Sequence, residues 1–316
     1  MNILYISSVE FLPYAVVSIV SLFENNKEAK ALTVYLYCES MSTEDERKIY
    51  ALQEKYHRVI KRITDPTVLA NFRRFIQDNS FPSFQGCNYT YAKIMPHLLV
   101  PDVEKLLVVD SDTLVLQNLT PLYNLDVSDY FCAAIPELMA RYVSSEDPLI
   151  LHRKEFYYNS GVLLFNIAKM KKESYTQRIV NAYKNYKGKL RLADQSLLNL
   201  SLNGVEILPV NVKYNYNNGW NVSAPFRRVM HRDYRQLGLF DERQGERKYK
   251  NMAILHFIGM LKPWTCSCFC PNTFLYLKYQ KKTSWGKKIS LLKDLRQGYW
   301  KWRDYKKFFD NKFKQI

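Results

Sequence analysis

The first 63 residues alternate short apolar runs with segments of helical periodicity, and this alternation constrains the fold more than any other feature of the chain. Three of the runs have the composition of buried strands: residues 2–8, 31–38 and 58–63. Two segments between them have the patterns of helices: residues 13–24 and 42–56. A strand–helix–strand–helix–strand order predicts an α/β domain with a largely parallel central sheet.

The pattern continues along most of the chain. Further helices are expected at residues 91–99, 171–186 and 194–202. Further strands are expected at residues 105–109, 131–135, 162–166, 205–208 and 252–257. Because no internal repeat and no Gly/Ser-rich linker interrupts the pattern, we expect one domain over residues 1–270 and a separate tail over residues 271–316.

Several common devices are missing from the sequence. The ten glycines form neither G-x-G-x-x-G nor a Walker loop, which argues against a usual dinucleotide or P-loop site. Neither a G-x-S-x-G elbow nor an H-E-x-x-H helix occurs. No apolar run approaches the roughly 18 residues needed to cross a bilayer, and the first residues lack the pattern of a signal peptide. We therefore expect a cytoplasmic protein.

Positive charge gathers in the tail. The chain has 46 Lys and Arg against 30 Asp and Glu, a net charge of +16, and residues 271–316 contain 13 of the basic and 3 of the acidic residues. Aromatic residues are interleaved with the basic ones, and residues 289–313 are expected to be partly helical. This mixture suits an anionic membrane surface. A single-strand nucleic-acid binder and a basic helix packed on the domain are the alternative interpretations.

The strand expected at residues 105–109 is followed by Asp110-Ser111-Asp112. In an open α/β sheet, ligands bind beyond the carboxyl ends of the strands. Two carboxylates separated by one residue can both reach a hard divalent cation, which prefers oxygen ligands. The same residues could form a surface turn or cap, so this motif alone leaves both interpretations open.

Three later segments join this motif in a recognisable order: Asn159-Ser160-Gly161 ahead of the strand at 162–166, then Asp194-Gln195, then His256-x-x-Gly259-x-x-Lys262-Pro263-Trp264. Together the four segments resemble glycosyltransferase family 8. This is a retaining, metal-dependent group that includes glycogenin and bacterial lipopolysaccharide galactosyl- and glucosyltransferases. The resemblance extends from the first strand to Trp264, and it implies a GT-A nucleotide-sugar fold with helices flanking a mostly parallel sheet.

The resemblance implies a metal site and a site for the donor diphosphate. Asp110, Asp112 and His256 would hold Mn²⁺ or Mg²⁺ between the phosphates of a UDP-sugar, and an imidazole ligand favours Mn²⁺. For His256 alone, a buried core histidine would be the ordinary interpretation. Lys262 would neutralise the departing diphosphate, and Gly259 would let backbone N–H groups approach it.

The resemblance also implies residues around the transferred sugar. Lys93 stands where the family usually has arginine, so it supplies charge with less orientation. Asp194 and Gln195 would lie beneath the sugar, with Asp194 as a helix N-cap in the ordinary interpretation. The remaining expected substrate contacts come from Asn159, Gly161, Glu137 and Ser8. The sequence Ser7-Ser8-Val9-Glu10 departs from the acidic and amide residues with which relatives read the uracil.

These observations predict a hexosyltransferase that moves galactose or glucose from a UDP-sugar to a saccharide hydroxyl of lipopolysaccharide or another surface glycan. Gln195, Asp194 and Lys262 are its expected catalytic residues. We expect it on the inner face of the cell membrane, attached through the tail, with no nucleic-acid partner. A non-catalytic UDP-sugar-binding protein of the same fold and a nucleic-acid binder that acts through its tail are the alternatives.

Overall fold

The computed structural model describes residues 1–82, 89–143, 148–151, 156–186, 188–240, 252–265, 268–285 and 295–314. The chain divides into two compact units. The first comprises residues 1–10, 29–110 and 120–210. The second comprises residues 11–28, 111–119 and 211–316. The described part of the predicted tail, 271–316, lies in the second unit, and a domain boundary at residue 270 stays a prediction.

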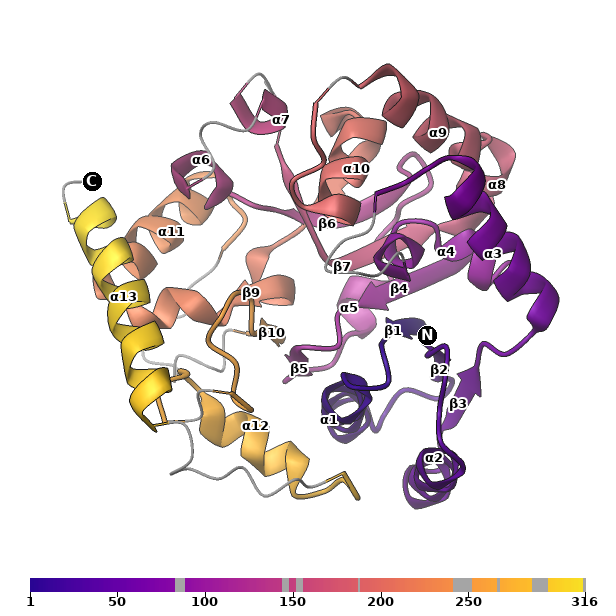
Figure 1. Cartoon of the computed structure of the whole chain (residues 1–316), viewed down its shortest axis with the longest axis horizontal. Coiled ribbons are helices and arrows are strands. Elements are labelled where there is room, and N and C mark those ends of the chain that lie inside the picture. The colour runs from indigo at the N-terminus through magenta and orange to yellow at the C-terminus, as the bar shows by residue number, and fades with distance from the viewer. Residues whose placement is uncertain are drawn as a thin grey trace. The chain divides into compact units, whose positions relative to one another are not determined.

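A seven-stranded sheet forms the centre of the first unit, with the strand order β3–β2–β1–β4–β7–β6–β8 (Figure 1). The strands are β1 Asn2–Ile6, β2 Thr33–Tyr37, β3 Val59–Arg62, β4 Lys105–Val109, β6 Cys132–Pro136, β7 Tyr158–Asn166 and β8 Ile207–Pro209. Strands β1 to β4 run parallel, as do β6 and β8, whereas β7 is antiparallel to both neighbours. The predicted α/β class with a mostly parallel sheet is confirmed.

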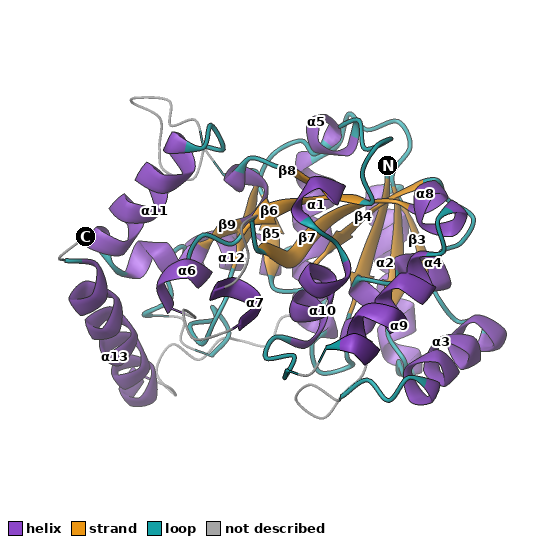
Figure 2. Ribbon diagram, turned by 90° about the horizontal axis from the view of Figure 1, so that it is seen from above, coloured by secondary structure: helices purple, strands orange, loops and turns teal. Residues whose placement is uncertain are grey.

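Helices flank this sheet (Figure 2). They are α2 Thr43–Tyr56, α3 Pro66–Asp78, α4 Pro96–Leu99, α5 Thr120–Tyr123, α6 Ala140–Val143, α7 Pro148–Leu151, α8 Ile167–Lys172, α9 Tyr175–Asn185 and α10 Ala193–Ser201, with 3-10 turns η1 Tyr89–Lys93 and η2 Gly204–Glu206. Leu4 of β1, Val108 of β4 and Leu197 of α10 belong to one buried cluster. This core fixes the end of β4, where the first predicted ligand stands.

The second unit contains a three-stranded sheet with the order β5–β10–β9. Its elements are α1 Leu12–Asn25, β5 Thr113–Val115, η3 Val212–Asn215, β9 Tyr216–Asn217, η4 Asn218–Val222, α11 Ala224–Gln236, β10 Ile254–His256, α12 Thr273–Gln280 and α13 Leu295–Phe313. His256 pairs with Thr113 across the antiparallel β5 and β10. This register places His256 beside the residue that precedes Thr113, which is Asp112.

Two predicted helices are divided. Residues 171–186 form α8 and α9 rather than one helix, because Ser174 adopts a left-handed φ of +49° between them. Residues 91–99 form a 3-10 turn and the single-turn α4. Pro96 opens α4, and since proline restricts the residue before it, the chain cannot continue as one helix.

Asn159 and Gly161 lie inside β7, not ahead of a strand as predicted. The segment Tyr158–Gly161 is bonded at both ends to neighbouring parts of the chain. Tyr158 pairs with Pro136 of β6, and the Gly161 carbonyl accepts a hydrogen bond of 2.9 Å from Asp110 N. These polar residues are therefore held by the sheet itself.

Residues 289–294 of the expected tail helix lie outside the described residues, and α13 begins at Leu295. Among the described helices, none combines the length and the apolar character required of a membrane span.

Candidate active site

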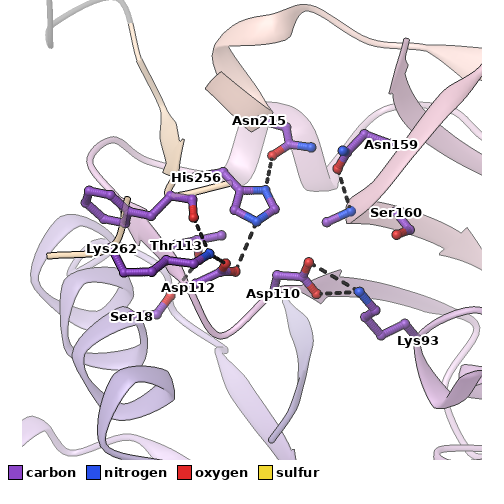
Figure 3. Close-up of polar contacts among 12 residues, drawn as sticks. Ser18, Lys93, Asp110, Asp112, Thr113, Asn159, Ser160, Asn215, His256 and Lys262 are labelled. Carbon is purple, nitrogen blue, oxygen red and sulfur yellow. Dashed lines mark hydrogen bonds and ion pairs between the residues drawn. The ribbon is translucent and has the colours of Figure 1, made fainter. Parts of the chain in front are cut away.

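Lys93 joins two predicted functional carboxylates in the first unit, and Figure 3 shows its contact with one of them, Asp110. Its Nζ lies 3.0 Å from Asp110 Oδ1 and 3.1 Å from Asp194 Oδ2. Asp110 ends β4, Lys93 ends the 3-10 turn η1, and Asp194 lies in the first turn of α10. Burial alone would lower the pKa of Lys93, but the two carboxylates outweigh it and raise the pKa above its ordinary value. The lysine is therefore charged and compensates both acids.

Asp194 is not a helix N-cap, because Leu192 occupies that position and Asp194 lies two residues later. Its Oδ1 accepts a hydrogen bond of 2.6 Å from the Thr90 hydroxyl, and its other oxygen faces Lys93. The carboxylate is buried. A buried acid held by a hydroxyl and an ammonium is fixed in one orientation, as expected of a group that must accept hydrogen bonds from a ligand.

Asn159 hydrogen-bonds two other residues that were predicted to contact substrate, Glu137 and Gly161. Its Nδ2 donates to Glu137 Oε2 at 2.9 Å, and its Oδ1 accepts from Gly161 N at 2.8 Å. Both Asn159 and Glu137 are buried, with 7% and 8% of their surfaces exposed. This arrangement orients the Asn159 amide of β7 against the Glu137 carboxylate, which directly follows β6.

Gln195 is buried next to Asp194 on α10, and its Oε1 accepts a hydrogen bond of 3.2 Å from Ser160 N of β7. Asn199, one turn later, binds β7 at two atoms: its Oδ1 accepts from Tyr158 N and its Nδ2 donates to Tyr158 O. Asn199 was not predicted as a site residue. Its bonds fix α10 against β7, and thereby fix Asp194 and Gln195.

Asp112 is the centre of a network in the second unit (Figure 3). Its Oδ1 lies 3.0 Å from His256 Nε2, its Oδ2 accepts a hydrogen bond from Lys262 Nζ, and its carbonyl accepts from Phe257 N at 2.9 Å. Burial opposes ionisation of Asp112, but the charges and hydrogen bonds of Lys262 and His256 outweigh it and hold its pKa far below the ordinary value. Asp112 is therefore an ionised, partly buried carboxylate.

Asn215 fixes the orientation of His256. The distance from His256 Nδ1 to Asn215 Oδ1 is 2.8 Å, and both residues are buried. Since an amide oxygen can only accept, Nδ1 donates, and Nε2 is directed at Asp112. Metal-binding histidines characteristically use the second ring nitrogen in this way. Asn215 was not predicted, because nothing in its local sequence marks it.

The loop from His256 to Trp264 carries the other predicted phosphate contacts. Gly259 has a φ of +87°, a conformation that side-chain-bearing residues rarely adopt. Lys262 Nζ also donates to Phe257 O and lies 5.9 Å from the centre of the Trp264 ring. Trp264 stacks on Tyr14 of α1 with ring centres 3.9 Å apart. The Lys262 ammonium is thus positioned by the Trp264 ring, the Phe257 carbonyl and the Asp112 carboxylate.

Asp110 and Asp112 are separated by one residue, and the chain passes from the first unit to the second between residues 110 and 111. Two extended residues span at most about 7 Å, so the covalent chain keeps the two α-carbons within that distance. Ser8, which follows β1, hydrogen-bonds the Glu10 side chain, and this bond lowers the pKa of Glu10. A role of Ser8 in binding substrate stays a prediction.

The chain has the GT-A fold, which it shares with solved glycosyltransferases. The galactosyltransferase LgtC, solved in complex with donor and acceptor sugar analogues, has the same fold with a TM-score of 0.68, 20% identity, and coverage of 90% of this chain and 96% of that chain. The bifunctional glycosyltransferase WbbM gives a TM-score of 0.71 at 16% identity, over 92% of this chain and 51% of that chain.

Comparison of the amino-acid sequence with protein families identifies the family within this fold. The model of glycosyl transferase family 8 matches residues 2–268, so this chain belongs to glycosyltransferase family 8. A putative glycosyltransferase of Haemophilus influenzae is 26% identical over 68% of this chain and 63% of its own length. General stress protein A of Bacillus subtilis is 25% identical over 62% and 65%, so the matches span less than two thirds of these two relatives. The lipopolysaccharide 1,2-glucosyltransferase of Escherichia coli is 25% identical over 79% and 69%.

Proposed function

We propose that this glycosyltransferase moves a hexose, galactose or glucose, from a UDP-sugar to a saccharide hydroxyl of lipopolysaccharide or a related surface glycan, with retention of configuration. The observation that carries the proposal is the Asp112–His256–Lys262 network in a family 8 chain. The relationship to a lipopolysaccharide glucosyltransferase supports the acceptor class. The neighbour LgtC, solved with donor and acceptor sugar analogues, supports a two-substrate site.

Asp110, Asp112 and His256 would hold a divalent cation, Mn²⁺ or Mg²⁺. The donor set fits such an ion, because it offers two carboxylates and an imidazole whose outer nitrogen is already fixed by Asn215. When bound, the ion supplies Lewis-acid stabilisation of the departing diphosphate. The chain's own contributions are the ionised Asp112 and the directed Nε2 of His256.

Lys262 and Gly259 would bind the donor diphosphate. The ammonium of Lys262 would stabilise negative charge that grows on the leaving group, and the left-handed backbone at Gly259 would let backbone N–H groups approach it. Lys93 would hold Asp110 and Asp194 in place. Its role is orientation, since its charge is already engaged by two carboxylates.

Asp194 would accept hydrogen bonds from the hydroxyls of the donor sugar, Asn159 would also contact that sugar, and Glu137 would lie near the acceptor. Gln195 would lie near the anomeric carbon, but its neutral amide oxygen already accepts a hydrogen bond from Ser160 N, which makes it a poor nucleophile. We therefore favour attack by the acceptor from the face that the diphosphate leaves, with the leaving phosphate taking the acceptor's proton. A trapped glycosyl-enzyme adduct would exclude this mechanism.

Helix α13 supports the proposal of peripheral attachment to the inner face of the cell membrane. Trp300 and Phe308 are exposed on it, with 45% and 51% of their surfaces accessible, among the exposed cations Arg303, Lys307 and Lys312. Aromatic rings beside Lys and Arg bind anionic lipid surfaces, at roughly 1 kcal/mol for each basic residue near the surface. A lipid-linked acceptor would be located at this membrane surface, so attachment would bring the enzyme to its substrate.

The test is release of UDP from a panel of UDP-sugars, with Mn²⁺ and with EDTA, by the wild type and Asp112→Ala. We expect Mn²⁺-dependent release from one sugar and its loss in the variant. Binding of UDP with every UDP-sugar left intact would favour a non-catalytic binding protein. Affinity for single-stranded nucleic acid that falls steeply with salt and is unaffected by Asp112→Ala would favour the nucleic-acid alternative.

A further inference from the structure

Helix α13 is packed firmly against the second unit through one of its faces. Phe309 stacks face to face on Phe226 of α11, with ring centres 4.1 Å apart and an angle of 1°, and Phe313 adds a second stacked ring at 4.7 Å. The Ser223 hydroxyl donates to Asp310 Oδ1 at 2.7 Å. Both Phe309 and Phe313 are buried. The helix therefore has a fixed inner face as well as the exposed face described above.

The inner face brings Tyr305 over two glycines. A β-carbon at Gly219 would lie 2.7 Å from the Tyr305 hydroxyl oxygen, closer than such atoms approach. A β-carbon at Gly259 would lie 3.5 Å from the same oxygen. The hydroxyl is the atom nearest to both positions. At Gly219 the absence of a side chain is what makes room for the tyrosine, whereas 3.5 Å at Gly259 is an ordinary van der Waals separation.

Both glycines are connected directly to the cluster around Asp112. Gly219 donates its N–H to Asn217 Oδ1 at 2.8 Å, and Asn217 pairs with His256 across the parallel strands β9 and β10. Gly259 lies three residues after His256 and three before Lys262. The tyrosine thus touches the segments that carry the imidazole and the ammonium of the proposed donor site.

We propose that Tyr305 is a positioning residue for the donor diphosphate. Its ring and hydroxyl restrain the left-handed backbone at Gly259. The loop from Phe257 to Lys262 therefore keeps its phosphate-binding conformation before the donor binds. A glycine in this conformation is otherwise among the least restrained points of a chain. This inference rests on the proposed function, and it makes α13 a component of the donor site in addition to any role at a membrane.

The experiment measures UDP binding in the presence of Mn²⁺ by calorimetry, and donor KM and kcat, for full-length variants. Tyr305→Ala should weaken UDP binding and raise donor KM by about tenfold, as expected for losing one or two neutral contacts, with acceptor KM unchanged. Tyr305→Phe, which lacks only the oxygen nearest the glycines, should lose about threefold. Phe308→Ala is the matched control, because this exposed aromatic ring lies on the same helix, and we expect it to bind UDP as the wild type does.

Gly219→Ala perturbs the same contact while the tyrosine itself remains. Its β-carbon would lie 2.7 Å from the Tyr305 hydroxyl oxygen and 3.0 Å from Asn217 Oδ1, so it displaces the tyrosine and also crowds the residue that pairs with His256. Donor affinity should therefore fall at least as far as in Tyr305→Ala. Wild-type affinity in both Tyr305→Ala and Gly219→Ala would overturn the inference. Equal losses for donor and acceptor together with a lowered melting temperature would also overturn it, because they indicate a structural role alone. A wild type that binds no UDP would instead refute the proposed function.

Discussion

Replacing Lys93 by methionine tests whether the ion-pair network of the first unit is a structural requirement of the site. The change keeps most of the side-chain volume but removes the charge that lies 3.0 Å from Asp110 and 3.1 Å from Asp194. All three side chains are largely buried, with exposed fractions of 16%, 21% and 7%. The variant therefore leaves two buried carboxylates without their counter-ion.

The magnitude follows from the geometry. At an effective dielectric constant of about 20, each pair at this distance has a gross Coulomb energy of about 5 kcal/mol, much of which is offset by the cost of desolvating the ions. Removing one partner of a buried pair typically destabilises a protein by about 3–5 kcal/mol. Because Lys93 and Asp110 retain some exposure, we expect a loss of about 3 kcal/mol in the free energy of unfolding.

The assay is urea unfolding of the wild type, Lys93→Met, Asp194→Asn and the double variant. In the double variant one unpaired carboxylate is gone, so the destabilisation should be smaller than the sum of the single effects by 1 kcal/mol or more, on the order of measured coupling energies. Lys184→Met, at an exposed lysine of α9, should change stability by no more than about 0.5 kcal/mol. Wild-type stability in Lys93→Met, or strictly additive effects in the double variant, would refute the reasoning.

Three further outcomes are expected. Asp112→Asn should lower Mn²⁺-dependent UDP release by about 100-fold or more, by loss of a charged ligand, and full activity in this variant would exclude Asp112 from the site. Burial and, to a smaller extent, the charge of Lys171 lower the pKa of His97 from 6.5 to about 4. The neutral imidazole therefore contributes about 3 kcal/mol to the free energy of unfolding above pH 6.5, and this contribution is lost as the pH falls towards 4. His97→Gln should remove this slope from urea unfolding measured across that pH range, and an unchanged slope would contradict the assignment. Trp300→Ser with Phe308→Ser should reduce sedimentation with anionic vesicles severalfold and leave UDP binding unchanged, and equal sedimentation would contradict attachment through α13.

The predicted elements are most accurate where one short segment determines its own structure. The run KLLVV forms β4 over the predicted residues because its four consecutive buried side chains, Leu106 to Val109, suit a central strand. Helix α2 begins after Ser42, whose hydroxyl accepts from Asp45 N at 3.1 Å, as its local sequence indicates. Helix α3 was not predicted, although Asp65 caps it and Phe72 and Ile76 form its buried side.

The predictions are wrong or incomplete where the conformation of a residue depends on contacts with distant segments of the chain. Asn159 is polar and was placed ahead of the strand, yet Glu137 accepts from its side chain and Asn199 binds the backbone of β7, both from elsewhere in the chain. The roles of Asn215 and Tyr305 depend on partners 41 residues away and on the packing of α13. No local pattern distinguishes these side chains from ordinary ones, so the sequence offers candidates for the reacting groups and leaves out the side chains that orient those candidates.

The charges of the proposed site explain why the donor should depend on a cation. Asp110, Asp112 and Asp194 contribute three negative charges and Lys93 and Lys262 two positive ones, so these groups carry a net charge of −1. A diphosphate is itself anionic and would be repelled, whereas a divalent ion reverses the sign to +1. We therefore expect UDP to bind at least about tenfold more weakly in EDTA than in Mn²⁺, and to recover part of that loss in Asp112→Asn without metal. Equal affinity with and without metal would show that the lysines alone are sufficient for the diphosphate.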